Sequence, residues 1–164
     1  MLTPDLEQAA AFLSLLDPEA QAFTFQTFDD QKERKRGDLV RIFNGTLEQH
    51  APELTRLSAE GAGVFVTVNE TDGRGRRLAN IVRLRAIFQE ADMPGAKVPP
   101  LEPHIVVESS PGKFHRYWLI DSATEPPVIE WLAVMRRMVA DWDSDPNAKD
   151  AARVLRLPGF PHQK

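Results

Sequence analysis

The stretch His104-Ile-Val-Val-Glu-Ser-Ser-Pro-Gly-Lys-Phe-His-Arg-Tyr-Trp-Leu-Ile120 decides the fold. Two segments rich in β-branched and aromatic residues, 104–108 and 114–120, flank a turn that contains Pro and Gly. Pro and Gly readily adopt the backbone angles of tight turns, so the stretch predicts a β-hairpin. The strands of a hairpin run antiparallel, and we therefore expect a mostly antiparallel sheet.

Other strands and helices are predicted on both sides of this hairpin. Strands are expected at 22–28, 64–69, 82–90 and near 153–157, and helices at 5–16, 38–43, 47–59 and 128–142. The last helix carries an apolar stripe, in steps of four and three, formed by Val128, Leu132, Met135, Val139 and Trp142. The predicted fold class is α+β, with a mostly antiparallel sheet and helices packed against one face.

Composition limits the class of protein. The chain has 164 residues, of which 42% are hydrophobic and 27% charged, and this suits one well-packed domain. No apolar run approaches the roughly 20 residues that cross a bilayer, and the first residues do not have the features of a secretory signal. We therefore expect a soluble, cytoplasmic protein that does not bind membranes. Because the chain has no cysteine, disulfides, thiolate zinc sites and cysteine nucleophiles are excluded.

The charge is unevenly distributed. A formal net charge of -4 argues against a protein that coats nucleic acid through bulk charge. From residue 106 onward, however, the chain carries Lys113, Arg116, Arg136, Arg137, Lys149, Arg153, Arg156 and Lys164. A local anion site is compatible with the negative total.

Two charged segments are predicted to be solvated. Residues 29–36 are most simply an exposed turn. The loop at 70–77 is rich in Gly and Arg, but it lacks the spacing of a loop that cradles phosphate. It is predicted to be a mobile, hairpin-like loop, and contact with nucleic acid is the alternative.

The first candidate for chemistry is the pair Glu90 and Asp92, at the end of a predicted strand. Alternate residues of a strand point the same way, so these carboxylates could together hold one or two divalent cations. The alternative is a strand end with solvated acids.

The second candidate is the turn before His115. Ser110, the backbone amides of the turn and Lys113 could hold a phosphate beside this histidine. The alternative for His115 is a packed, hydrogen-bonded core residue.

The third and fourth candidates lie near the end of the chain. The acidic cluster consists of Asp141, Asp143, Asp145 and Asp150, and one of these could meet the Glu90 and Asp92 pair across the sheet. In the closing stretch, a Pro-Gly turn could bring His162 and Lys164 towards the same anionic group as Arg156. A solvated chain end is the alternative.

Taken in this order, the segments resemble the archaeo-eukaryotic primase superfamily, and most closely the replication-protein-B-type primase domains of plasmids and phages. The resemblance runs from Phe25 to Lys164. Glu90-Ala-Asp92 looks like the acid-x-acid motif of the family, with Glu in place of the more usual Asp. Residues 110–115 look like its Ser-x-His motif, with a longer spacing. Residues 145–159 are similar to its third acidic motif, which is followed by a basic strand and a turn.

The resemblance implies roles for these residues. Glu90, Asp92 and Asp145 would bind Mg²⁺ or Mn²⁺, and these three together with His115 would be catalytic. The nucleotide would be bound by Ser110, Lys113, His115, Arg156, His162 and Lys164. Asp143 or Asp150 remains the alternative to Asp145. The implied architecture is an RRM-like catalytic core forming a single domain over residues 1–164, consistent with excision from a longer replication protein.

The implied function is that of a DNA primase or primase-polymerase. Such an enzyme would use two metal ions to transfer nucleotides from nucleoside triphosphates to primers on a single-stranded DNA template in plasmid or phage replication. A replicative helicase is a further possible partner. Two alternatives remain: a non-catalytic replication initiator of the same fold, and a metal-dependent nuclease or relaxase. For a relaxase only Tyr117 is available, and it lies in the middle of a predicted strand.

Overall fold

The computed structural model describes residues 3–31 and 33–163. In chain order the elements are α1 (Leu6–Leu16), β1 (Phe23–Asp29), β2 (Arg41–Gly45), α2 (Leu47–Ala59), β3 (Ala62–Thr67), β4 (Glu70–Thr71), β5 (Ile81–Arg83), β6 (Ala86–Ala91), β7 (Ile105–Ser110), β8 (Lys113–Leu119), α3 (Val128–Trp142) and β9 (Val154–Arg156). Every strand pairing among the described residues is antiparallel. The predicted α+β class is confirmed, but the strands divide between two larger sheets and a small β4–β5 ribbon.

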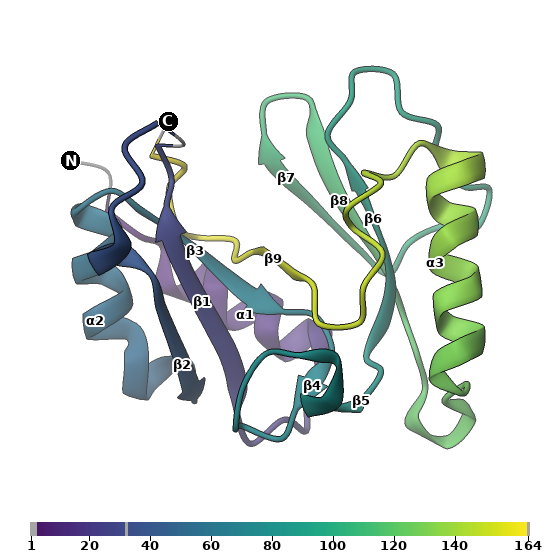
Figure 1. Cartoon of the computed structure of the whole chain (residues 1–164), viewed down its shortest axis with the longest axis horizontal. Helices are drawn as coiled ribbons and strands as arrows, with labels where there is room; N and C mark the ends of the chain where they lie inside the picture. The colour runs from purple at the N-terminus through teal and green to yellow at the C-terminus, as the bar shows by residue number, and fades with distance from the viewer. Residues whose placement is uncertain (1–2, 32, 164) are drawn as a thin grey trace.

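The first sheet has the strand order β2-β1-β3-β9, so the last strand of the chain joins strands from its first half. Helices α1 and α2 lie together on one side of this sheet (Figure 1). Alternate residues of β1 divide between its faces: Phe25 is fully buried and packs edge-on against His50 of α2, whereas Phe28 lines a pocket on the other side. One face of the sheet is therefore free to form the wall of a site.

The second sheet has the order β6-β8-β7, and it contains the predicted hairpin as β7 and β8. Helix α3 packs on β6 (Figure 1). The indole N–H of Trp131 donates a 2.9 Å hydrogen bond to the Ala86 carbonyl, and the Trp131 ring lies 5.9 Å from that of Phe88. The buried hydrogen bond satisfies the polar atom of a fully buried Trp, as such a position requires.

One hydrophobic core joins the two sheets. Phe12 of α1 meets Tyr117 of β8 edge to face, with ring centroids 5.4 Å apart. The same cluster includes Phe25 of the first sheet and Met135 of α3. None of the helices in the described residues combines the length and apolarity needed to span a bilayer.

Two element predictions were wrong. Residues 38–43 were expected to be helical, but they form a short 3₁₀ turn and the edge strand β2, where the Leu39 carbonyl accepts a 2.7 Å bond from Thr27 Oγ1. The strand expected at 82–90 is divided into β5 and β6. It breaks there because the Arg85 amide donates to Asn69 Oδ1, at 2.9 Å, instead of to a neighbouring strand.

Candidate active-site cleft

A pocket of about 340 Å³ lies between the open face of the first sheet and the second sheet. One wall comes from β1, β3 and β9, and the other from β6, β7 and β8. The pocket brings together most of the predicted site residues: Glu90, Asp92, Ser110, Lys113, His115, Arg156 and His162. Residues more than 70 positions apart in the sequence therefore share one cleft.

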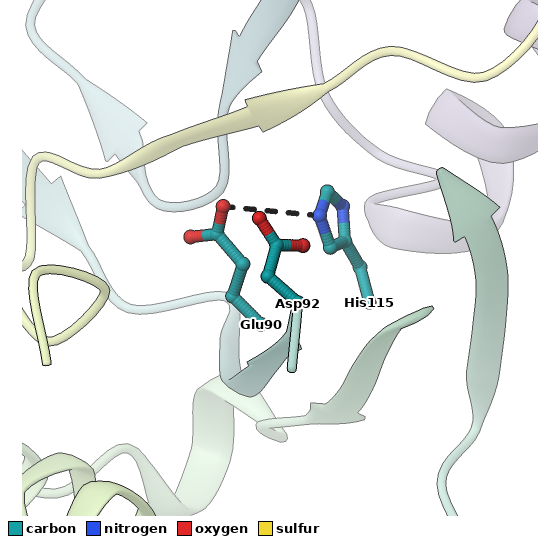
Figure 2. Close-up of side chains that lie close together, drawn as sticks. All are labelled: Glu90, Asp92 and His115. Atoms are coloured by element: carbon teal, nitrogen blue, oxygen red, sulfur yellow. Dashed lines mark ion pairs between the residues drawn. The ribbon is translucent and has the colours of Figure 1, made fainter. Parts of the chain in front are cut away.

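Strand pairing brings Glu90 and His115 together. These two residues are register partners in the β6–β8 ladder, and Asp92 follows directly after β6. The three side chains point towards one another in Figure 2, with one ligand atom from each lying within 4.8 Å of the others. The Nε2 atom of His115 is 4.0 Å from Glu90 Oε1.

Burial shifts the ionisation of this group. It raises the pKa of Glu90, an effect that the nearby Arg153 opposes. It also lowers the pKa of His115 to about 4, because this residue is only 4% exposed. The imidazole is therefore neutral at neutral pH, and it would act here as a hydrogen-bonding or metal-ligating group, without the positive charge expected of a pyrophosphate contact.

The group has the chemistry of a divalent-metal site. Carboxylate oxygens are the donors that Mg²⁺ and Mn²⁺ prefer, and neutral imidazole can complete such a set. The Nδ1 atom of His115 is buried and has no hydrogen-bond partner among the described residues. The other ring nitrogen, Nε2, is the one that lies near Glu90 and could bind a metal ion together with the carboxylates.

Arg153 was missed in the sequence analysis as a site residue. Its Nη2 atom lies 2.7 Å from Glu90 Oε2 in a partly buried ion pair. Arg153 directly precedes β9 of the first sheet. Its side chain therefore crosses the cleft to reach Glu90 in the second sheet. The only sequence signal was its place in the basic stretch 153–156.

The opposite wall holds Arg156 on a buried carboxylate. Arg156 donates two hydrogen bonds to Asp30, at 2.7 and 3.1 Å, and its guanidinium stacks 4.7 Å from the Phe65 ring centroid. Asp30 Oδ2 also accepts a 2.8 Å hydrogen bond from the backbone amide of Gln163, and Asp30 Oδ1 lies 3.9 Å from His162 Nε2. One carboxylate thus positions both Arg156 and the segment that carries His162.

The position of Asp30 corrects the interpretation of residues 29–36 as a solvated turn, because its side chain is only 4% exposed. Burial by itself raises the pKa of this carboxyl. The hydrogen bonds from Arg156 and from the Gln163 amide outweigh that effect, and the pKa is lowered overall. Asp30 is therefore ionised at neutral pH and neutralises part of the charge that Arg156 brings to the cleft.

The β7–β8 turn lies at the edge of the cleft. Ser110 pairs with Lys113, and both line the pocket. The Gly112 amide is already bonded to Glu108 Oε1 at 3.0 Å, whereas phosphate binding by the turn would need free amides. The phosphate-binding roles of Ser110 and Lys113 stay predictions.

Comparison with known proteins identifies the family. The sequence model of the RepB DNA-primase N-terminal domain matches residues 82–164, just over half of the chain. The chain belongs to this RepB primase family. A comparison with curated protein sequences gave no match.

Solved structures of primases share the fold. The archaeo-eukaryotic primase domain of the cyanophage S-2L primase-polymerase superposes with a TM-score of 0.77 at 23% identity, over 99% of this chain and 86% of that one. The primase RepB' gives 0.68 at 18% identity, over 96% and 51%. The catalytic domain of RepB' in complex with initiator DNA gives 0.65 at 20% identity, over 96% and 78%. The fold of this RepB-family chain is therefore that of primase catalytic domains.

The third carboxylate of this family member stays a prediction. The Asp145 amide donates to the Glu90 carbonyl at 2.9 Å, and the Asp145 charge helps to raise the pKa of Glu90, but Asp145 does not line the pocket. Asp150 does line it. Asp143 is exposed and ends α3 in a left-handed conformation. The predicted site residue Lys164 lies outside the described residues.

The structure disfavours a relaxase. Tyr117 is fully buried, its ring packs against Phe12, and burial raises the pKa of its hydroxyl. A relaxase nucleophile must reach a DNA phosphate, and a core tyrosine of the second sheet cannot do so without unfolding part of the domain.

Proposed function

We propose that the chain is the catalytic domain of a DNA primase or primase-polymerase that acts in plasmid or phage replication. It would join nucleotides from nucleoside triphosphates to primers on a single-stranded DNA template. The observation that carries this proposal is the cleft, where Glu90, Asp92 and His115 face a wall that bears Arg156 and His162. The family membership supports the same reaction class.

One wall of the cleft would bind metal ions and the other would bind phosphate. Glu90 and Asp92, with Asp145 as the predicted third ligand, would hold Mg²⁺ or Mn²⁺. Such ions neutralise a triphosphate and lower the pKa of an attacking hydroxyl group. Arg156 and His162 would bind the phosphates that leave as pyrophosphate, since guanidinium groups form strong paired hydrogen bonds to phosphate oxygens.

The alternative functions make different demands on this cleft. A non-catalytic initiator needs the fold and a DNA-binding surface, but it does not need buried carboxylates that converge on a histidine. A metal-dependent nuclease could use the same carboxylates. It would shorten labelled single-stranded DNA where a primase would lengthen a primer.

A primer-synthesis assay tests the proposal. The chain is incubated with single-stranded template, labelled nucleoside triphosphates and either Mg²⁺ or Mn²⁺, and products are separated by length. We expect labelled oligonucleotides from the wild type and none from Asp92→Ala, which should remain folded because Asp92 lies outside the core. Normal synthesis by Asp92→Ala would exclude the metal role of this residue, and the absence of products from the wild type would reject the primase proposal.

A further inference from the structure

The arginine-rich segment 72–80 between β4 and β5 is ordered, although the sequence predicts a mobile loop. The Asp72 amide donates to the Asn80 carbonyl at 2.8 Å, which closes the loop at its base. The Arg77 amide donates to Asn80 Oδ1 at 3.0 Å, and the Arg74 amide donates to Asp72 Oδ1 at 2.8 Å. These bonds give the loop a defined shape before any ligand arrives.

The loop is also docked on the open face of the first sheet. The Gly73 backbone has a φ of +74° and lies so close to β2 that a Cβ atom there would come within 2.7 Å of Asn44 Nδ2. Arg76 fixes the other side: its Nε donates to Gln26 Oε1 and its Nη1 to the Ala152 carbonyl, both at 3.1 Å. Through Arg76 the loop becomes part of the wall of the cleft.

The charge of the loop is left unbalanced. Arg74 and Arg77 are exposed, and within residues 3–31 and 33–163 neither side chain forms an ion pair. Of the acids nearby, Glu70 pairs with Arg83 at 2.6 Å. Asp72 accepts hydrogen bonds from neutral groups, the Asn80 side-chain amide and the Arg74 backbone amide, so its single charge stands against the three arginines of the loop. Two unpaired guanidinium groups are therefore presented by a rigid loop that adjoins the cleft.

We infer that the 72–80 loop binds the phosphate backbone of single-stranded DNA as the strand enters or leaves the cleft. The inference rests on the proposed function, because it takes the cleft to be the place of polymerisation. Arg76 lines the cleft, whereas Arg74 and Arg77 are exposed outside it, so the loop carries arginines both inside and outside the cleft. Successive phosphodiester groups of a strand match such a series, and the planar fork of arginine suits each of them.

The test measures DNA binding and nucleotide binding separately. Arg74→Gln/Arg77→Gln is compared with the wild type and with Arg136→Gln/Arg137→Gln, which removes the same charge from the exposed side of α3. Fluorescence anisotropy follows a labelled oligo(dT) strand between about 50 and 200 mM salt. We expect about tenfold weaker DNA binding by the loop variant at low salt, and a salt slope smaller by about 1.4, since each phosphate contact on a single strand contributes about 0.7. The affinity for a nonhydrolysable nucleotide should stay unchanged.

Several outcomes would overturn the inference. If the loop variant matched either the wild type or the α3 variant in DNA affinity and salt slope, the loop would not be the DNA contact, although primer synthesis by the wild type would leave the proposed function standing. A selective loss of nucleotide affinity would assign the loop to the triphosphate. If the wild type bound no single-stranded DNA and made no primers, both proposals would fail together.

Discussion

A mutation of Arg156 alone would report on two effects at the same time, because its guanidinium is held by the buried Asp30 carboxylate. Neutralising Arg156 should weaken nucleotide binding by roughly 1.5 to 3 kcal/mol if it contacts phosphate. It would also leave Asp30 buried without its main partner, which destabilises the folded state. The two effects must be separated before the nucleotide result can be interpreted.

A double-mutant cycle separates them. We expect Asp30→Ala and Arg156→Ala each to lower the free energy of unfolding by about 3 kcal/mol, and the double variant to lose about 1 to 3 kcal/mol less than their sum. Urea denaturation measures all three. The exposed pair Arg137 and Asp141 is the control, where the coupling should stay within about 0.5 kcal/mol. Additive losses for Asp30 and Arg156 would show that the buried pair is not coupled.

The choice of the third carboxylate can be made by measuring metal binding. We expect Asp145→Asn to weaken Mn²⁺ binding, detected by calorimetry, by about tenfold or more, because Asp145 is joined to Glu90 through its backbone and affects the pKa of Glu90. Asp150→Asn, at the mouth of the same cleft, should have a smaller effect. The reverse order would transfer the role to Asp150.

The sequence predicted some of these residues and missed others for a physical reason. Glu90 lies in β6 and Asp92 follows directly after the strand, two positions along the chain, so their convergence follows from local geometry. The aromatic strand around His115 indicated a neighbouring position. Asp30 and Arg156 are 126 positions apart. Their contact depends on β9 joining the first sheet, a pairing that no local pattern reveals.

At the level of elements, local patterns sufficed where an element had a strong period or a clear turn. The β7–β8 hairpin and helix α3 were predicted closely, and α2 begins at a Thr46 capping box as its sequence allows. β2 was mistaken for a helix because its pairing with β1 depends on tertiary contacts. Ile42 is 54% exposed on that edge strand, so burial did not produce an alternating pattern there.

The turn after β9 depends on Gly159 for a close backbone approach. Gly159 has a φ of +87°, and a Cβ atom there would come within 2.1 Å of the Asp5 carbonyl oxygen. Its own carbonyl accepts the Asp5 amide at 2.7 Å, which ties the turn to the start of α1. The Pro-Gly break in the sequence thus marks a contact between the two ends of the described chain.

We expect Gly159→Ala to lower the free energy of unfolding by at least about 2 kcal/mol, because backbone strain is added to an overlap that no rotamer can relieve. Gly112→Ala is the matched control. Gly112 has a φ of +75° with nothing within 4 Å of the added carbon, so only the backbone strain of about 1 kcal/mol should remain. Equal losses in urea denaturation would show that the approach to Asp5 is unimportant.

At the scale of the whole molecule, the cleft separates two sheets that share one core. Phe12 of α1 contacts Tyr117 of the second sheet. Strand β9 follows all strands of the second sheet in the chain, but it pairs in the first sheet. Neither sheet therefore buries its hydrophobic surface alone. This arrangement supports the prediction of a single domain over residues 1–164.

We expect one cooperative unfolding transition. All three tryptophans, Trp118, Trp131 and Trp142, lie in β8 and α3, so their fluorescence reports on the second sheet and its helix. Hydrogen exchange of the β1 and β3 amides reports on the first. The free energies from fluorescence and from the slowest exchanging amides should agree within about 1 kcal/mol. A clearly lower value for one sheet would divide the chain into two folding units.

The ion pair between Arg153 and Glu90 balances part of the negative charge of the cleft from within the chain. A carboxylate that is buried without any cation would push neighbouring groups apart or take up a proton. Here Arg153 offsets part of the cost of burying Glu90, whose pKa is still raised overall. The domain should therefore need no divalent ion to reach or keep its fold, unlike small domains that unfold when a chelator removes their metal. Preparation in a chelating buffer should yield a folded, inactive protein whose thermal midpoint equals that of the untreated sample.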